Sequence, residues 1–277
     1  MKYENALQEA RSKKDVLVAA HRGVSGGNIP FNTMKAFDAA LCQGADILET
    51  DVTICKDGEI FIFHPKQEIN HLNQDIHLEQ MTAEEIRALR YVNFDNNITE
   101  YELPTLDEFL EKYKNRCIIN LDHAWDHDLV KVLTAVKRHN MEDQILMKTP
   151  MKTEYLQIME ELAPTMMFMP IIKEKDEISE QLEKMKINFV GSELVFTSDE
   201  CPIVQDAYIE AQHKKGRLLW ANAILYSYKA QLSGGHTDDV AVAGNPDYGW
   251  GWLIDKGFDI IQTDWVSPLC NYIANRK

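Results

Sequence analysis

Ionisable side chains stand at or near the ends of several short apolar runs in this chain of 277 residues. They include His21, Glu49, Asp51, Asp122 and Asp264. A charged side chain at the end of a buried strand is costly unless it is paired or binds a metal ion. Several such residues in one chain therefore indicate a functional site rather than a scatter of surface ion pairs.

Glu49 and Asp51 are two positions apart, so in a strand their side chains point to the same face. Two carboxylates that close repel each other unless a cation lies between them. Together with Asp122 they would form the set of oxygen ligands that suits Mg²⁺ or Ca²⁺. An exposed edge strand is the alternative for this pair, but the apolar neighbours on both sides favour a strand that is covered on both faces.

His21 and His64 are the candidate acid–base pair, because imidazole can donate or accept a proton near neutral pH. Four other histidines are interpreted as structural: His71, His77, His139 and His213. His123 and His127 have the spacing of a zinc-binding helix, but the glutamate that follows the first histidine of that motif is absent. Zinc is therefore disfavoured.

The elements that must position these residues follow a regular rhythm. Eight short apolar or β-branched runs occupy residues 16–21, 46–51, 117–122, 145–149, 166–172, 187–196, 217–222 and 259–264. Stretches of helical period lie between several of them, at 33–43, 126–139, 153–162, 177–186 and 201–215. This alternation predicts an α/β protein, a (β/α)₈ TIM barrel forming a single domain over residues 1–277. An open doubly wound sheet is the alternative, because short runs do not reveal whether a sheet closes.

Two intervals between the runs are long, and each predicts an insertion. Residues 61–101 follow the second strand, and the Lys56-Asp57-Gly58 sequence just before them predicts a hairpin. Residues 224–252 follow the seventh strand and, being rich in Gly and Asp, predict a long loop. Insertions that follow barrel strands lie at the face where active sites are built.

The composition limits the possible partners and locations. The formal net charge of −15 argues against nucleic acid and anionic membranes as partners. No apolar run approaches the roughly 18 residues that would span a bilayer, and no signal peptide is visible at the start. The five cysteines are scattered along the chain, a pattern typical of a protein whose thiols are reduced rather than joined in disulfides. We therefore expect a cytoplasmic protein that acts on a small molecule; the composition leaves its oligomeric state open.

The motifs that carry these residues resemble those of glycerophosphodiester phosphodiesterases. In chain order they are Ala-His-Arg-Gly at 20–23, Pro-Phe-Asn-Thr at 30–33, Leu-Glu-Thr-Asp-Val at 48–52, Lys-Asp-Gly at 56–58, a histidine at 64, Leu-Pro-Thr-Leu at 103–106 and Gln-Thr-Asp-Trp at 262–265. Their order and spacing are kept over residues 16–272. The combination is specific, although each motif alone is weak.

The resemblance implies a (β/α)₈ barrel with one divalent metal ion, Mg²⁺ or Ca²⁺. It implies metal ligands at Glu49, Asp51 and Asp122, and general acid–base roles for His21 and His64. Arg22 would contact the phosphate of a small phosphodiester substrate. The implied reaction is hydrolysis of a glycerophosphodiester to an alcohol and glycerol 3-phosphate.

Three positions depart from the family pattern. Phe31 replaces an acid, Pro65 follows the second histidine in place of an aspartate, and Ala124 replaces a lysine that would hold the phosphate. Asp122 is also shorter than the usual glutamate, as in the related sphingomyelinase D-like branch. We expect Lys148, at the end of the next strand, to supply the missing positive charge, with a solvated lysine before Pro150 as the alternative.

Two tryptophans complete the predicted substrate site. Trp220 and Trp265 lie near the ends of the last two strands and could form an aromatic wall for the alcohol, with packing in the barrel rim as the alternative. Two other functions remain open from the sequence. One is a phospholipase D-like enzyme acting on lysolipid head groups, and the other is a degenerate barrel that binds a phosphorylated ligand without turnover.

Overall fold

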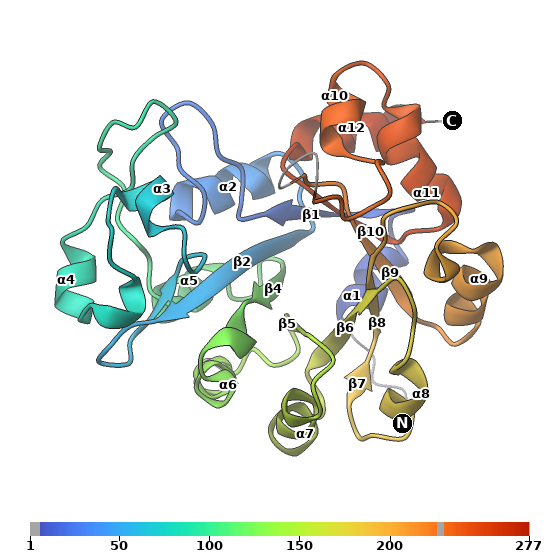
Figure 1. The fold of residues 1–277 in the computed structure, drawn as a ribbon, viewed down its shortest axis with the longest axis horizontal. Coiled ribbons are helices and arrows are strands. Elements are labelled where there is room, and N and C mark those ends of the chain that lie inside the picture. Colours follow the sequence, from blue (N-terminus) through green and yellow to red (C-terminus); the bar gives the residue numbers. More distant parts are fainter. Residues whose placement is uncertain (1–5, 226–229, 277) are drawn as a thin grey trace.

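The computed structural model describes residues 6–225 and 230–276. Eight parallel strands close into a ring, whose arrangement can be followed in Figure 1. The strands are β1 (Leu17–His21), β2 (Ile47–Ile54), β4 (Ile118–Asp122), β5 (Ile145–Thr149), β6 (Met167–Lys173), β8 (Gly191–Val195), β9 (Leu218–Asn222) and β10 (Ile260–Thr263). Strand β1 pairs with both β2 and β10, which closes the barrel. The closed barrel is therefore confirmed, and the open-sheet alternative is wrong.

Each predicted run contains one barrel strand, but the run at 187–196 is interrupted. It holds the short strand β7 (Asn188–Phe189), which pairs only with the lower part of β6, and then β8, which pairs with the upper part. The interruption leaves the eight-strand ring intact.

Side chains along each strand point alternately outward and inward, so the protein has one apolar core between the strands and the helices and another inside the barrel. Residues such as Val18, Leu48 and Ile119 point outward and pack under the helices. Residues such as Leu17, Ile47 and Ile118 form a second cluster with Leu7 of α1 (Ala6–Arg11). These second-cluster residues share a strand face with His21, Glu49 and Asp122, respectively, because they are separated by even numbers of positions. The interior is therefore apolar toward the start of the strands and polar toward their ends.

Helices surround the barrel (Figure 1). The longer ones are α2 (Met34–Cys42), α5 (Leu106–Tyr113), α6 (Leu129–Arg138), α7 (Thr153–Leu162), α9 (Asp206–Lys214) and α12 (Val266–Asn275). Thr105 begins α5 with a capping box to Glu108, which explains the helix start at the Leu-Pro-Thr-Leu motif. Two predicted helices begin later than expected because the 3₁₀ turns η2 (Ala124–Asp126) and η3 (Pro202–Val204) precede them, and α8 (Ser179–Leu182) is shorter than its pattern.

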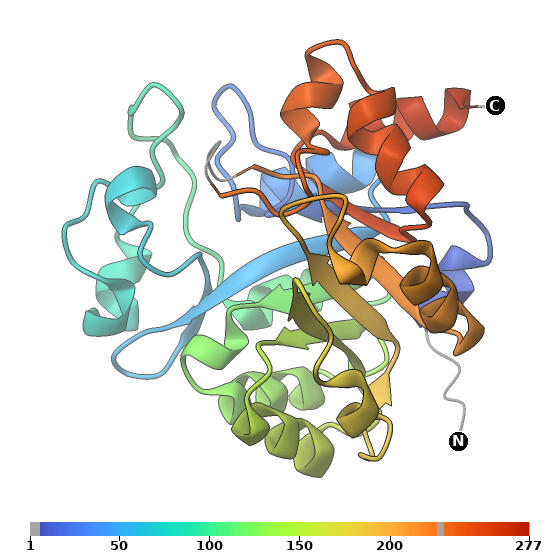
Figure 2. The same ribbon diagram turned by 45° about the vertical axis from the view of Figure 1, so that its right-hand side comes forward.

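The first insertion begins with the predicted hairpin. Strand β3 (Ile60–Ile62) pairs antiparallel with the end of β2. It is followed by α3 (Glu68–Leu72), η1 (Leu78–Gln80) and α4 (Ala83–Arg87), which have a small apolar core of their own around Phe61, Phe63 and Tyr91. This unit stands beside the barrel (Figure 2).

The second insertion is more regular than the predicted long loop. Residues 238–256 form α10 (Asp238–Val242), the π-helical turn η4 (Asp247–Gly251) and α11 (Trp252–Lys256), so the loop prediction is wrong there. The glycines allow close packing: a Cβ on Gly249 would lie 2.8 Å from the Cβ of Ala241. Within the described residues, no helix is long and apolar enough to cross a membrane.

Candidate active site

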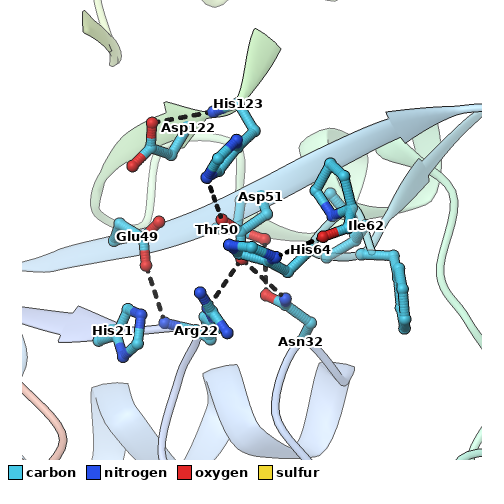
Figure 3. A network of polar contacts seen from close by, with 12 residues as sticks. His21, Arg22, Asn32, Glu49, Thr50, Asp51, Ile62, His64, Asp122 and His123 are labelled. Atoms are coloured by element: carbon cyan, nitrogen blue, oxygen red, sulfur yellow. Dashed lines mark hydrogen bonds and ion pairs between the residues drawn. The ribbon is translucent and has the colours of Figure 1, made fainter. Parts of the chain in front are cut away.

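Three carboxylates meet at the end of the barrel where the parallel strands terminate (Figure 3). Glu49 and Asp51 come from β2 and Asp122 from β4, and the register places Asp51 beside Asp122. One oxygen from each lies within 4.8 Å of the other two. The inward-facing pair predicted from the two-residue spacing is therefore present, and these three oxygens could hold a divalent ion.

The acids have unusual proton affinities. Burial raises the pKa of Glu49 well above its ordinary value, and the nearby charges of Asp51 and Asp122 raise it further. Burial also raises the pKa of Asp122. Burial alone would raise the pKa of Asp51 as well, but the neighbouring Arg22 and His64 outweigh it and lower the pKa to about 2.

Arg22 and Asn32 hold Asp51 in place. The Nε of Arg22 lies 2.9 Å from Oδ2 of Asp51, and Nδ2 of Asn32 donates to the same oxygen at 3.1 Å. The backbone N–H of Arg22 donates to Oε2 of Glu49 at 3.0 Å. Both Arg22 and Asn32 have left-handed backbone conformations, with φ of 56° and 55°. Asparagine adopts this conformation readily, whereas an arginine in it is uncommon, and such outliers cluster at functional sites.

His21 and His64 flank the acids, and each has one nitrogen engaged. Nδ1 of His21 lies 2.8 Å from Oδ1 of Asp264, and Nδ1 of His64 lies 2.8 Å from the backbone oxygen of Pro65. Since these oxygens only accept, Nδ1 carries the hydrogen in both rings. Burial lowers the pKa of His64 to about 4, although Asp51 opposes the shift. The neutral His64 ring therefore has Nε2 as its basic atom, and Pro65, a departure from the family motif, orients it through a backbone carbonyl.

His123 is a further member of the cluster that motif analysis did not select as a site residue. Its Nε2 lies 4.0 Å from Oδ1 of Asp51, and its ring centre is 4.5 Å from that of His64. Burial alone would lower the pKa of His123, but Asp122, Asp51 and Asp126 outweigh it and raise the pKa. The sequence signal for His123 was its place directly after Asp122, a candidate metal ligand at the end of a strand.

A cavity of about 200 Å³ opens above the acids. Its walls include the acids Glu49, Asp51 and Asp122 and the histidines His21 and His123. Other wall residues were not selected from the sequence: Trp125, Ile171, Lys173, Glu193, Asn222 and Gln262. Glu193, Asn222 and Gln262 lie on strands β8, β9 and β10. Gln262 begins the Gln-Thr-Asp-Trp motif, which was the available sequence signal for that residue, whereas nothing in the local sequence marks Glu193 as a mouth residue.

Lys148 and Trp220, like Arg22 and His64, are absent from the wall of this cavity, so the expectation that Lys148 and Trp220 contact the substrate stays a prediction. Both are fully buried. Nζ of Lys148 lies 2.6 Å from Oε2 of Glu193 and 3.2 Å from the centre of the Trp220 ring. Nε1 of Trp220 donates to Oδ1 of Asn222 at 2.9 Å. The two side chains instead form a polar layer within the barrel, because an unpaired ammonium there would be costly.

Trp265 directly precedes α12 as its N-cap residue and is 46% exposed. It is absent from the wall of the cavity, so its contact with substrate stays a prediction. Ala124, where the family has lysine, is fully buried and offers no charge.

A family model described only as a domain of unknown function matches residues 168–273. Two curated relatives are each 31% identical: the uncharacterized protein YqiK of Bacillus subtilis over 139 residues, and a glycerophosphodiester phosphodiesterase of Caldanaerobacter subterraneus over 140 residues. Each match covers 48% of this chain and 57% of the relative. The chain thus matches little more than half the length of these relatives.

Solved structures match over a larger part of the chain. A glycerophosphoryl diester phosphodiesterase from Parabacteroides distasonis has a TM-score of 0.77 at 20% identity, covering 99% of this chain and 93% of its own. A phosphodiesterase from Oleispira antarctica, solved with its product sn-glycerol-3-phosphate, has a TM-score of 0.67 at 18% identity, covering 94% and 97%. These likenesses show the fold. The homologues with a named activity and the structural neighbours of this chain are thus glycerophosphodiester phosphodiesterases and close variants of them.

Proposed function

We propose that this chain is a metal-dependent phosphodiesterase that hydrolyses glycerophosphodiesters to an alcohol and glycerol 3-phosphate. The observation that carries the proposal is the convergence of three carboxylates and two oriented histidines at one end of the barrel. The named relatives and the product-bound neighbour support the same reaction class. The five dispersed, unbridged cysteines support a cytoplasmic location.

The ligand set fits a divalent cation. Glu49, Asp51 and Asp122 offer only oxygen atoms, and burial together with repulsion from the other two carboxylates raises the pKa of Glu49. Hard cations such as Mg²⁺ or Ca²⁺ prefer such ligands. When bound, the ion would supply positive charge to the oxygens of the phosphate. Arg22, already paired with Asp51, would add a second positive charge beside the acids.

The histidines divide the proton transfers between them. His64, with its low pKa, takes a proton from water through Nε2 as the water oxygen bonds to phosphorus. The bond between phosphorus and the alcohol oxygen breaks, and that oxygen receives a proton from Nε2 of His21. Asp264 holds the His21 ring through Nδ1, which leaves Nε2 to face the substrate. The products are the free alcohol and glycerol 3-phosphate, and one water molecule is consumed.

A second candidate is a phospholipase D-like activity on lysolipid head groups. Phe94 and Ile98, at the turn that ends the first insertion, are 97% and 77% exposed. Exposed apolar side chains on an insertion favour contact with a lipid aggregate. A relative from Homo sapiens named lysophospholipase D GDPD1 is 28% identical over 157 residues, covering 51% of this chain and 48% of its own length.

A hydrolysis panel tests these proposals. Glycerophosphocholine, glycerophosphoethanolamine, glycerophosphoglycerol and a lysophospholipid are each assayed with Mg²⁺ and with Ca²⁺. We expect cleavage of the water-soluble diesters and its loss in EDTA. Turnover of the lysophospholipid alone would favour the second candidate.

Metal binding measured by calorimetry separates an enzyme from a degenerate barrel. We expect one divalent ion per chain, and Glu49→Gln should remove most of the affinity because one of the three ligands is lost. An intact metal site without turnover of any substrate would indicate a binding protein. Full activity of metal-free Glu49→Gln protein would contradict the proposed site.

A further inference from the structure

Positive charge is scarce at the cavity that holds the acid cluster. Lys148 is held inside the barrel by Glu193, and the guanidinium of Arg22 is held by Asp51. Neither lines the cavity, and Ala124 has no charge. The cavity wall contains four carboxylates, those of Glu49, Asp51, Asp122 and Glu193. A phosphodiester is an anion, so its binding beside them needs a cation from the chain as well as the metal ion.

Lys173 is the lysine that lines this cavity. It is the last residue of β6 and shares a strand face with Met169 and Ile171, so it stands on the inner face at the mouth. Its side chain is exposed, and within residues 6–225 and 230–276 no carboxylate lies within ion-pair distance of it. Its charge is therefore available to a ligand.

Lys173 also lines a second, larger cavity of about 680 Å³ next to the first. The two cavities share His123, Trp125, Ile171 and Lys173. The remaining wall of the second is largely apolar and is formed by Pro150, Met151, Ile172 and Ile178, with charged groups at its edge. Lys173 thus stands where the two cavities meet.

The other charges around the second cavity are paired. His123 pairs with Asp126, and Lys175 pairs with Glu177. The Trp125 ring stacks on His123 at a centroid distance of 5.3 Å and an angle of 29°. The second cavity therefore combines an apolar wall with the one uncompensated positive charge of Lys173, a combination that disfavours a cationic ligand.

We propose that the second cavity is the subsite for the leaving alcohol, and that Lys173 contacts the phosphodiester at the junction. The inference rests on the proposed phosphodiesterase function. A diester bound with its phosphorus at the acid cluster places one ester arm in the smaller cavity, and the other arm enters the second cavity past Lys173. The alcohols that fit are neutral or anionic and carry an apolar portion, while quaternary ammonium alcohols fit poorly.

The test compares three esters of glycerol 3-phosphate that differ only in the leaving alcohol: glycerol, 2-phenylethanol and choline. For the wild type we expect the highest kcat/KM with the phenylethyl ester and the lowest with the choline ester. Met151→Ala removes apolar wall from the second cavity alone. It should lower the ratio of kcat/KM for the phenylethyl ester to that for the glycerol ester about tenfold. This ratio is independent of how much of the variant is folded.

Lys173→Met tests the junction. It should lower kcat/KM for the glycerol and phenylethyl esters by roughly tenfold or more, and for the choline ester by less, because repulsion is relieved at the same time. Calorimetry in Mg²⁺ should show weaker binding of glycerol 3-phosphate. Lys152→Met is the matched control, since Lys152 is exposed near the end of β5 and lines neither cavity.

The outcomes distinguish a failure of the proposed phosphodiesterase function from a failure of the proposed alcohol subsite. A wild-type enzyme that cleaves none of the three esters would overturn the proposed function and the subsite with it. Cleavage by the wild type with an unchanged ester ratio in Met151→Ala and unchanged kinetics and binding in Lys173→Met would overturn the subsite alone.

Discussion

The two histidines at the barrel mouth differ in the group that orients each ring. A carboxylate faces Nδ1 of His21, whereas a neutral backbone carbonyl faces Nδ1 of His64. Burial lowers the pKa of His64 and so favours its neutral ring. The difference in orienting group is the basis for the opposite proton-transfer roles that we propose for the two rings.

The asymmetry predicts the pH dependence. The pKa of His64 is lowered to about 4, so its ring loses its proton, and becomes able to act as a base, as the pH rises through about 4. We expect kcat/KM to rise across that range. His64→Ala should lower kcat by roughly 10²–10⁴ and abolish this limb of the profile. If the kcat of His64→Ala stays within a few-fold of the wild-type value and its pH profile is unchanged, His64 is not the general base, and His123 becomes the candidate for that role.

Lys148 is a buried charge that the fold pairs with a carboxylate. Its ammonium and the Glu193 carboxylate form an ion pair among buried side chains. Lys148→Met leaves the carboxylate without its cation, so we expect a loss of about 3–5 kcal/mol in the free energy of unfolding, measured with urea. Replacing Glu193 by Leu in the Lys148→Met chain should restore part of the lost free energy of unfolding. The exposed Lys152→Met should change stability little, and an equally stable Lys148→Met would contradict the ion pair.

At the scale of elements, β8 and β9 approach each other unusually closely at Gly191. Its register partner is Leu218, and a Cβ built on Gly191 would lie 1.9 Å from the backbone oxygen of that residue. Glycine therefore allows the sixth barrel strand to begin against its neighbour, directly after the break between β7 and β8.

Gly191→Ala should consequently strain the barrel. The two strands must separate to admit a methyl group, and overpacking of this kind costs typically 1–3 kcal/mol. We expect a lower midpoint of thermal unfolding, measured by circular dichroism. Ser192→Ala, at the adjacent buried position, removes atoms rather than adding them and is the control. Equal midpoints for the two variants would show that the strands accommodate the methyl group.

At the scale of the whole molecule, the second insertion supports His21, the histidine that we propose as the general acid. Asp238 of α10 accepts hydrogen bonds from Nε1 of Trp250 at 2.7 Å, from Oγ1 of Thr263 at 2.7 Å and from the backbone N–H of Asp264 at 2.9 Å. Asp264 in turn holds His21. A segment 26 residues before Asp264 in the chain thus fixes the residue that orients His21.

This link makes stability depend on pH. Burial raises the pKa of Asp238 from 3.8 to about 7. Between these values the folded chain binds more protons at this site than the unfolded chain, so the contribution of Asp238 to stability is lost as the pH rises from about 4 to about 7. We expect Asp238→Asn to gain stability relative to the wild type between pH 5 and pH 8, measured by urea unfolding at each pH. A constant difference between the two proteins would contradict the raised pKa.

The sequence by itself determined much of the architecture. Alternating runs predicted the eight barrel strands, and Lys56-Asp57-Gly58 predicted the hairpin that ends β2. The two-residue spacing of Glu49 and Asp51 predicted their common face. These properties are local, because strand and turn preferences and the alternation of side chains depend on neighbours in the chain.

Only the tertiary structure decided whether the barrel closes, how deep each side chain lies in it and which groups pair with one another. The pairing of β1 with both β2 and β10 joins segments far apart in the chain, and no local pattern encodes it. Lys148 and Lys173 both stand near strand ends, yet one is sealed against Glu193 while the other opens into two cavities. The relative stagger of neighbouring strands sets how deep each side chain lies in the barrel, and that stagger exists only once the ring has closed.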